Sequence, residues 1–232
     1  MSREKHGAIF VRYIGWLTFL AGATNVCAVV LLQVTITHYT GNISKAAIAV
    51  GNGNLFGFLC IFPIILLFFL GTACSGFLFH NQEHSTKKYY AILPMVFGVM
   101  IFVTTSAATG HAALLGIISF LMGAQNGIYL DYRGIRVRTT HFSGYLSDAG
   151  YCFGAALHGN REEAWKCRFY LLSILLFFAG GVASAILVSL IGSHTLEVIA
   201  AIYSALGIYT ALGLAVGEKE TQAAREENGE LI

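Results

Sequence analysis

Long stretches without a charged residue limit what this chain can fold into. Residues 14–37 and 46–82 contain no Asp, Glu, Lys or Arg. Only 11% of the 232 residues are charged and 56% are apolar, whereas soluble proteins have about 25% charged residues. A helix needs roughly 20 apolar residues to cross a bilayer, and these continuous runs differ from the alternating strands of an outer-membrane barrel. The sequence therefore predicts an all-α integral membrane protein whose main partner is the lipid bilayer.

Composition also excludes several kinds of partner. A net charge of +2 provides no electrostatic footprint for nucleic acid. The five cysteines form no CxxC pair and most lie in apolar runs, so no metal site, cofactor or disulfide framework is predicted. The basic start of the chain leads into an apolar run that is longer than the core of a secretory signal. We therefore expect that run to be retained as the first helix.

The apolar runs predict six transmembrane helices in a single membrane domain, residues 1–232, with a tail at residues 217–232. In this arrangement 13 of the 14 basic residues fall on one side of the membrane, and only Lys45 falls on the other. The positive-inside rule then predicts cytoplasmic termini and a location in the cytoplasmic (inner) membrane. The predicted helices cover residues 13–34, a segment that ends near residue 79, and residues 91–108, 112–130, 169–190 and 196–216.

The two halves of the chain repeat several short motifs. Residues 37–44, THYTGNIS, match residues 140–147, THFSGYLS. Before them GATN matches GAQN, and after them the run ILLFF occurs in both halves. Each half holds three predicted helices, an odd number, so the second half must enter the membrane from the opposite side. The sequence therefore predicts two inverted repeats, residues 8–108 and 110–216, which are typical of secondary transporters. The two Thr-His segments are then expected on opposite faces of the bilayer.

These motifs resemble the signatures of the YoaK family, bacterial six-helix membrane proteins without an assigned activity. The first signature is Gly-x-x-Asp-Ala followed by Thr-Gly-Asn, but Asn25 and Val26 stand where the family has Asp and Ala. A titratable group is therefore missing at that position. The resemblance implies a six-helix membrane fold and names no substrate. The matching residues are Gly22, Thr40, Gly41 and Asn42 in the first half, and Gly123, Gln125, Asn126, Arg138, Thr139, Thr140, Ser143 and Gly144 in the second.

Polar residues of the repeats are the candidate solute-binding groups. Unpaired amides in hydrocarbon cost several kcal/mol, so Asn25 and Asn126 need protein partners or a wet cavity. They either bind a ligand or form hydrogen bonds between helices. Thr40 and Ser143 are predicted helix N-caps, and the free amides of a helix start either hold an anion or belong to a capped turn. The predicted binding residues are Asn25, Thr40, Asn42, Gln125, Asn126, Thr140 and Ser143, and the predicted structural glycines are Gly22, Gly41, Gly123 and Gly144.

Three further residues are candidates for coupling protons or anions. His38 and His141 match across the repeat, and histidine is a residue type that can couple protons, although most such histidines only form hydrogen bonds. Arg138 can hold an anionic solute or a lipid headgroup. A break is predicted near residues 51–54, because the uncharged run 46–82 is too long for one straight helix. We expect a short re-entrant or interfacial segment before the second spanning helix.

The leading functional hypothesis is a transporter or permease for a small solute. The alternative is a membrane scaffold or sensor that meets partners through the basic segment 133–168 and the acidic tail. A membrane-embedded enzyme ranks third, because His141, Ser143 and Asp148 are too close in sequence to converge easily as a catalytic triad. No catalytic residue and no enzyme activity is predicted. GxxxG pairs, such as Gly123 and Gly127, allow close helix packing within one chain or in a homo-oligomer.

Overall fold

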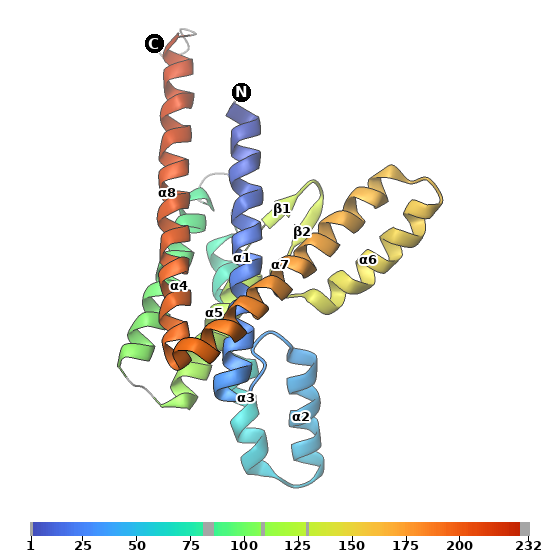
Figure 1. The fold of residues 1–232 in the computed structure, drawn as a ribbon, viewed down its shortest axis with the longest axis vertical. Helices are drawn as coiled ribbons and strands as arrows, with labels where there is room; N and C mark the ends of the chain where they lie inside the picture. The colour runs from blue at the N-terminus through green and yellow to red at the C-terminus, as the bar shows by residue number, and fades with distance from the viewer. Residues whose placement is uncertain (1, 81–85, 108–109, 129, 228–232) are drawn as a thin grey trace.

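The computed structural model describes residues 2–80, 86–107, 110–128 and 130–227. It is helical apart from one short hairpin (Figure 1). Residues 228–232, the end of the predicted tail, and residues 108–109, where the third predicted span ends, lie outside the described residues. The helices are α1 (Ser2–Leu32), α2 (Tyr39–Gly51), α3 (Leu55–Leu78), α4 (Thr86–Ser106), α5 (His111–Gly127), α6 (Phe142–Leu157), α7 (Arg161–Ile191), the short 3₁₀ turn η1 (Gly192–His194) and α8 (Thr195–Glu227), and the strands are β1 (Leu130–Tyr132) and β2 (Ile135–Val137).

Several helices are long and apolar enough to cross a membrane. Four candidate segments meet this description within the described residues: Phe10–Leu32, Leu55–Leu78, Lys88–Ser106 and Arg161–Val216. The last segment contains both α7 and α8. The prediction of an all-α, multi-pass membrane protein that contacts lipid is therefore confirmed.

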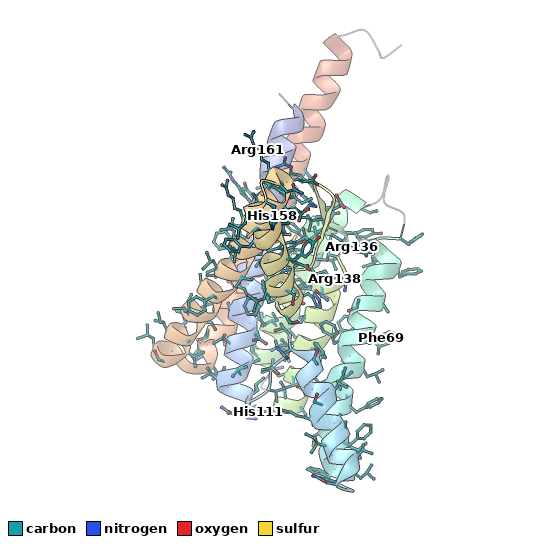
Figure 2. The ribbon with its side chains drawn as sticks, turned by 90° about the vertical axis from the view of Figure 1, so that its right-hand side faces the viewer. Phe69, His111, Arg136, Arg138, His158 and Arg161 are labelled. Carbon is teal, nitrogen blue, oxygen red and sulfur yellow. The ribbon has the colours of Figure 1, made fainter. Side chains whose placement is uncertain are left out.

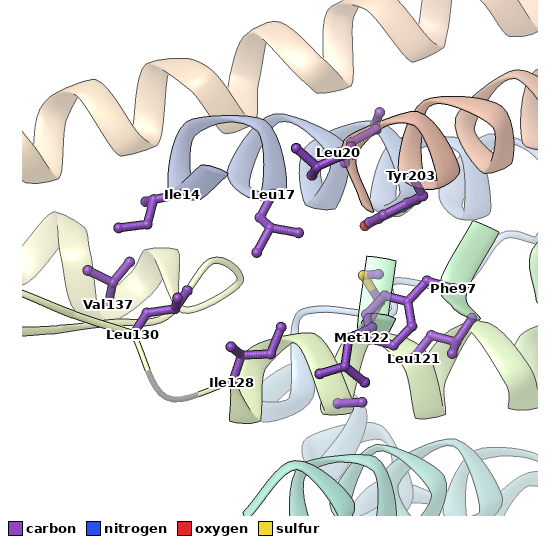
Figure 3. Close-up of a cluster of buried hydrophobic side chains, with 14 of the residues drawn as sticks. Ile14, Leu17, Leu20, Phe97, Leu121, Met122, Ile128, Leu130, Val137 and Tyr203 are labelled. Atoms are coloured by element: carbon purple, nitrogen blue, oxygen red, sulfur yellow. The ribbon is translucent and has the colours of Figure 1, made fainter. Parts of the chain in front are cut away.

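The core lies where α1, α4, α5 and α8 meet (Figure 3). Leu17 and Leu20 of α1 are fully buried against side chains from the other three helices. The hairpin formed by β1 and β2 adds Leu130 and Val137 to the same cluster. This packing leaves the outer faces of α3 and α7 apolar and exposed, as expected for helices that face lipid.

Close helix crossings depend on matched glycines from the two halves. A Cβ added at Gly22 in α1 would collide with the carbonyl oxygen of Phe177 in α7, and one at Gly123 in α5 would collide with that of Phe68 in α3. α4 and α8 cross reciprocally, because Gly98 meets the carbonyl oxygen of Ala200 and Gly207 meets that of Ala91. Only a residue without a side chain permits such close backbone contact.

The predicted break in the long uncharged run is present. α2 ends at Gly51 and α3 begins at Leu55. The two helices form a hairpin at the end of the molecule away from the termini, whereas α6 and α7 form a hairpin directed toward the end that carries the termini (Figure 1). Gly53 and Gly159 have positive φ angles in the two tight turns, of 68° and 89°. Each half therefore contains a short helix that folds back on a long one.

The segment predicted as a long basic loop, residues 133–168, is folded. It contains β2, α6 and the first turns of α7, which begins at Arg161 and not near residue 169. The early start has a local cause, because Oδ1 of Asn160 accepts hydrogen bonds from the backbone N–H groups of Glu162 and Glu163. Lys166 then forms ion pairs with both glutamates on the same face of the helix. Capping and these pairs extend the helix beyond the apolar run that predicted it.

Candidate functional site

The two repeated motifs mark the starts of α2 and α6. Histidines occupy both N-cap positions, His38 before α2 and His141 before α6, and neither side chain makes a capping hydrogen bond. The prediction that Thr40 and Ser143 are the N-caps is therefore wrong. Both are the second residues of their helices, and the carbonyl oxygen of each accepts a hydrogen bond from a serine hydroxyl one turn later.

Asn25 holds the start of α2 beside the last turns of α1. Its side-chain oxygen Oδ1 accepts hydrogen bonds from the backbone N–H groups of Ile36 and Thr37, both at 3.2 Å. Asn25 lies about two helical turns before the end of α1 at Leu32, a distance of roughly 10 Å along the axis. The chain reverses at Gln33, whose φ is 56°. The chain then runs back along α1, so α2 begins beside Asn25 and not beside the C-terminal end of α1.

The second half reaches the same region by way of the β-hairpin. The segment after β2 is held by two buried side chains. The hydroxyl of Tyr145 in α6 accepts a hydrogen bond from the backbone N–H of Arg138 at 2.7 Å, and Nε2 of Gln125 in α5 donates to Oγ1 of Thr139 at 2.9 Å. Burial raises the pKa of Tyr145 to about 12, so the hydroxyl remains protonated at neutral pH.

A cavity of about 390 Å³ lies where the two motifs meet. Its volume is in the range typical of small-molecule sites. Both halves of the chain contribute to its wall. The predicted binding and coupling residues that line it are Asn25, His38, Thr40, Asn126, Arg138, Thr140, His141 and Ser143.

The shared cavity shows that one expectation is wrong. The two Thr-His segments were expected on opposite faces of the bilayer, yet His38 and His141 line the same cavity. Two segments that border one small cavity cannot lie at opposite faces of a hydrocarbon core about 30 Å thick. The two segments meet because of the chain reversal after α1 and the hairpin after α5. Each brings the start of a short helix into the interior of the molecule.

Two predicted binding residues lie outside the cavity wall. Asn42 is 2% exposed, and its Nδ2 donates to the carbonyl oxygen of Thr35 at 2.9 Å. Gln125 is 1% exposed, donates from Nε2 to the carbonyl oxygen of Leu17, and accepts from the hydroxyl of Tyr203. Both amides are therefore occupied by hydrogen bonds within the protein.

Two lining side chains of the second half, Thr140 and Asn126, have a polar atom without a hydrogen-bond partner. Thr140 is only 5% exposed and lines the cavity, and its hydroxyl makes no hydrogen bond within the described part of the chain. Oδ1 of Asn126 is buried and likewise has no partner there. Its counterpart Asn25 accepts two hydrogen bonds. A buried polar group without a partner is costly, so these atoms are available to a ligand or water.

Aromatic rings line the cavity beside each helix start. The rings of Tyr39 and Phe68 lie 3.8 Å apart between centroids, and those of Phe142 and Phe177 lie 4.2 Å apart. None of these four rings was predicted to belong to the site. The signal was present, because Phe68 and Phe177 occupy matching positions in the repeated ILLFF run.

The two motif glycines differ in their surroundings. A Cβ added at Gly144 would collide with the ring of His141, whereas one added at Gly41 would lie 3.5 Å from Nδ1 of His38, an ordinary contact. The imidazole of His141 therefore packs over the first turn of α6 in space that only glycine leaves free.

Among the described residues that line the cavity, Arg138 is the only formally charged one, and none is an aspartate or glutamate. Figure 2 shows Arg138 partway along the molecule. Arg161 and His158 lie nearer to one end, and His111 lies nearer to the other. Among the described residues no group of three His, Cys, Asp or Glu side chains is placed to hold a metal ion. The wall can therefore donate hydrogen bonds and attract negative charge, but it offers no carboxylate to a cation.

Comparison with known proteins places the chain in a family. No curated protein and no solved structure matches it. A family model described as a protein of unknown function, DUF1275, matches residues 14–209. The match runs from α1 into α8 and includes every residue of the cavity wall. Because it covers well over half of the sequence, the chain belongs to the DUF1275 family.

Proposed function

We propose that this protein is a permease for a small solute, bound in the cavity between the starts of α2 and α6. The observation that carries the proposal is that matched segments of the two halves line one cavity. In secondary transporters, solute sites lie between repeats and are formed by interrupted helices. α2 and α6 are short helices that begin at the cavity, which supports a site of this kind.

Contacts between the halves support an inverted repeat of six spanning helices. The crossing of α1 with α7 at Gly22 has its counterpart in the crossing of α5 with α3 at Gly123. The reciprocal pair Gly98 and Gly207 fits a pseudo-two-fold axis between α4 and α8. α5 has 17 residues, close to the shortest spanning length. Together with α1, α3, α4, α7 and α8 it makes six helices, consistent with a YoaK-like member of the family.

The distribution of basic residues supports cytoplasmic termini in an inner membrane. Arg161 lies toward the end of the molecule that carries both termini (Figures 1 and 2). Lys45 belongs to α2 at the other end (Figure 1). Basic residues concentrate on the cytoplasmic side of membrane proteins. No enzymatic step is part of the proposal, since Asp148 does not line the cavity that His141 and Ser143 share.

Flux through purified protein in liposomes tests this proposal. We expect uptake of at least one small solute from a panel of anions, cations, sugars and amino acids, and a several-fold loss of that uptake in Asn126→Ala. Tyr209→Phe, in an exposed position on α8 outside the cavity, serves as the matched control and should retain uptake. Absence of flux and of binding across the panel would contradict the permease role. A stoichiometric protein partner captured by crosslinking without solute would favour a scaffold.

A further inference from the structure

We infer that the solute held in this cavity is a compact anion such as phosphate, sulfate or a short carboxylate, bound mainly by the second half of the chain. This inference names the substrate class of the proposed permease and rests on that proposal for its transport role. The binding chemistry itself depends on three features of the cavity wall: uncapped helix starts, unpaired polar side chains, and a single positive charge.

Both helices start at the cavity wall and have unpaired backbone N–H groups in their first turn. Neither His38 nor His141 caps its helix, and neither helix has an acidic residue in its first turn. The first three backbone N–H groups of α2 and of α6 have no hydrogen-bond partner in the described chain. The helix dipole adds partial positive charge at such an end. Two helices therefore direct donors at the same space from opposite halves of the chain, which favours an anion.

Thr140 and Asn126 provide an independent indication of a ligand. The hydroxyl of Thr140, in a residue that is 5% exposed, has no partner in the described chain although it borders the cavity. Oδ1 of Asn126, a hydrogen-bond acceptor, is also buried without a partner there. The hydroxyl of Thr140 is the buried group that can donate a hydrogen bond to an anion from the wall beside the start of α6. Beside α2, Oδ1 of the equivalent Asn25 already accepts two backbone N–H groups. The buried hydroxyl of Thr140 and the charge of Arg138 both belong to the second half, which therefore supplies the main contacts to the ligand.

Arg138 supplies the positive charge. It lines the cavity, forms no ion pair within the described residues, and has its backbone N–H fixed by the hydroxyl of Tyr145. An arginine with no acidic neighbour in the wall is suited to bidentate contact with oxyanions or carboxylates. Among the described residues that line this wall, a cation would find no carboxylate.

Binding to the full-length protein in nanodiscs of phosphatidylcholine tests the inference. The probes are sodium phosphate, sulfate and succinate at constant pH and ionic strength, with glycerol and glucose as neutral solutes and potassium against sodium as the cation comparison. We expect at least one anion to bind, with affinity reduced at least about tenfold in Arg138→Gln and in Thr140→Val. Arg136→Gln removes the same charge two residues away, outside the cavity wall, and should bind the anion normally.

The outcomes separate the anion from the transport role. Binding of a neutral solute or a cation in place of the anions, or anion binding that survives Arg138→Gln, would overturn the inference. Anion binding without flux in liposomes would overturn the permease proposal and leave the anion site intact.

Phosphatidylglycerol nanodiscs identify the source of the anion. Stabilisation by that lipid that is lost in Arg138→Gln and unaffected by free anions assigns the site to a lipid headgroup, whereas competition between lipid and phosphate assigns it to a free anion. The melting temperature of each variant without ligand shows that it is folded.

Discussion

The hydroxyl of Tyr203 in α8 donates a hydrogen bond of 2.6 Å to Oε1 of Gln125 in α5. Nε2 of the same amide donates to the carbonyl oxygen of Leu17 at 2.8 Å and to Oγ1 of Thr139 at 2.9 Å. One buried amide thus connects α1, α5, α8 and the segment that precedes α6. Because Thr139 is followed by Thr140 in the cavity wall, Gln125 positions that wall without touching its contents.

Tyr203→Phe should destabilise the fold by about 1 kcal/mol. The substitution keeps the ring but leaves Oε1 of Gln125 buried without a donor. A hydrogen bond between membrane helices contributes about 1 kcal/mol to stability. Thermal unfolding in detergent measures the effect. Tyr209→Phe is the control, because Tyr209 lies on the same helix, is 44% exposed, and makes no hydrogen bond among the described residues. Equal melting temperatures for the two variants would contradict the role assigned to Tyr203.

The two matched asparagines should respond differently to alanine. Asn25→Ala leaves the N–H groups of Ile36 and Thr37 without their acceptor, at a cost of about 1–3 kcal/mol. Asn126→Ala removes no hydrogen bond from its side-chain oxygen, so its melting temperature should stay close to that of the parent protein. Thermal unfolding of both variants makes the comparison internally controlled. A larger loss for Asn126→Ala than for Asn25→Ala would show that Asn126 has a structural role instead.

The sequence predicted which residues are equivalent better than it predicted which residues touch. Gly22 and Gly123 were paired by the repeat, but their contacts with the carbonyl oxygens of Phe177 and Phe68 depend on helix packing. A repeated motif identifies equivalent positions and contains no information about the neighbouring helix. The membrane class was predictable from composition alone, because the bilayer requires apolar helices of a particular length.

In the candidate site too, the repeat identified the motif but not which of its residues line the cavity. Gln125 and Asn126 were both predicted to bind solute, yet only Asn126 lines the cavity. Neighbouring residues on a helix point about 100° apart, so one motif necessarily supplies both a supporting and a lining side chain. Which of the two faces the cavity depends on the rotation of α5 against α1, and that rotation is set by packing. The N-caps were misassigned for a similar reason, since the reversal of the chain decides where each helix starts.

Gly144→Ala should weaken ligand binding more than Gly41→Ala. The added methyl group collides with the ring of His141 in the cavity wall, so the ring must move, whereas at Gly41 it meets only an ordinary contact of 3.5 Å. The shift in melting temperature caused by the bound anion, measured for both variants, tests this asymmetry. We expect a several-fold lower affinity for Gly144→Ala alone. The same loss in Gly41→Ala would indicate that backbone freedom, and not the imidazole position, decides binding.

Alanine at the crossing glycines should destabilise both halves similarly. Gly22→Ala and Gly123→Ala each place a methyl group against a backbone carbonyl that cannot rotate away, so the helices must separate, at a cost of roughly 1–3 kcal/mol. Gly76→Ala is the control, because no atom lies within 4 Å of its added Cβ, and its effect should stay within about 1 kcal/mol. Thermal unfolding measures all three. A strong effect at only one crossing would argue against equivalent packing in the two halves.

Labelling of single cysteines should distinguish the two hairpin tips by membrane side. Asn52 lies at the tip of α2 and α3, away from the termini, and His158 lies at the tip of α6 and α7 toward them (Figure 1). In a variant without the five native cysteines, Asn52→Cys should react with an impermeant maleimide only from the periplasmic side. His158→Cys should react only in inside-out vesicles, because the proposed orientation, based on the positive-inside rule, puts this end of the molecule in the cytoplasm. Labelling after solubilisation controls for reactivity. Reaction of both cysteines from one side would exclude the inverted repeat, since a pseudo-two-fold axis in the membrane plane must carry equivalent tips to opposite faces.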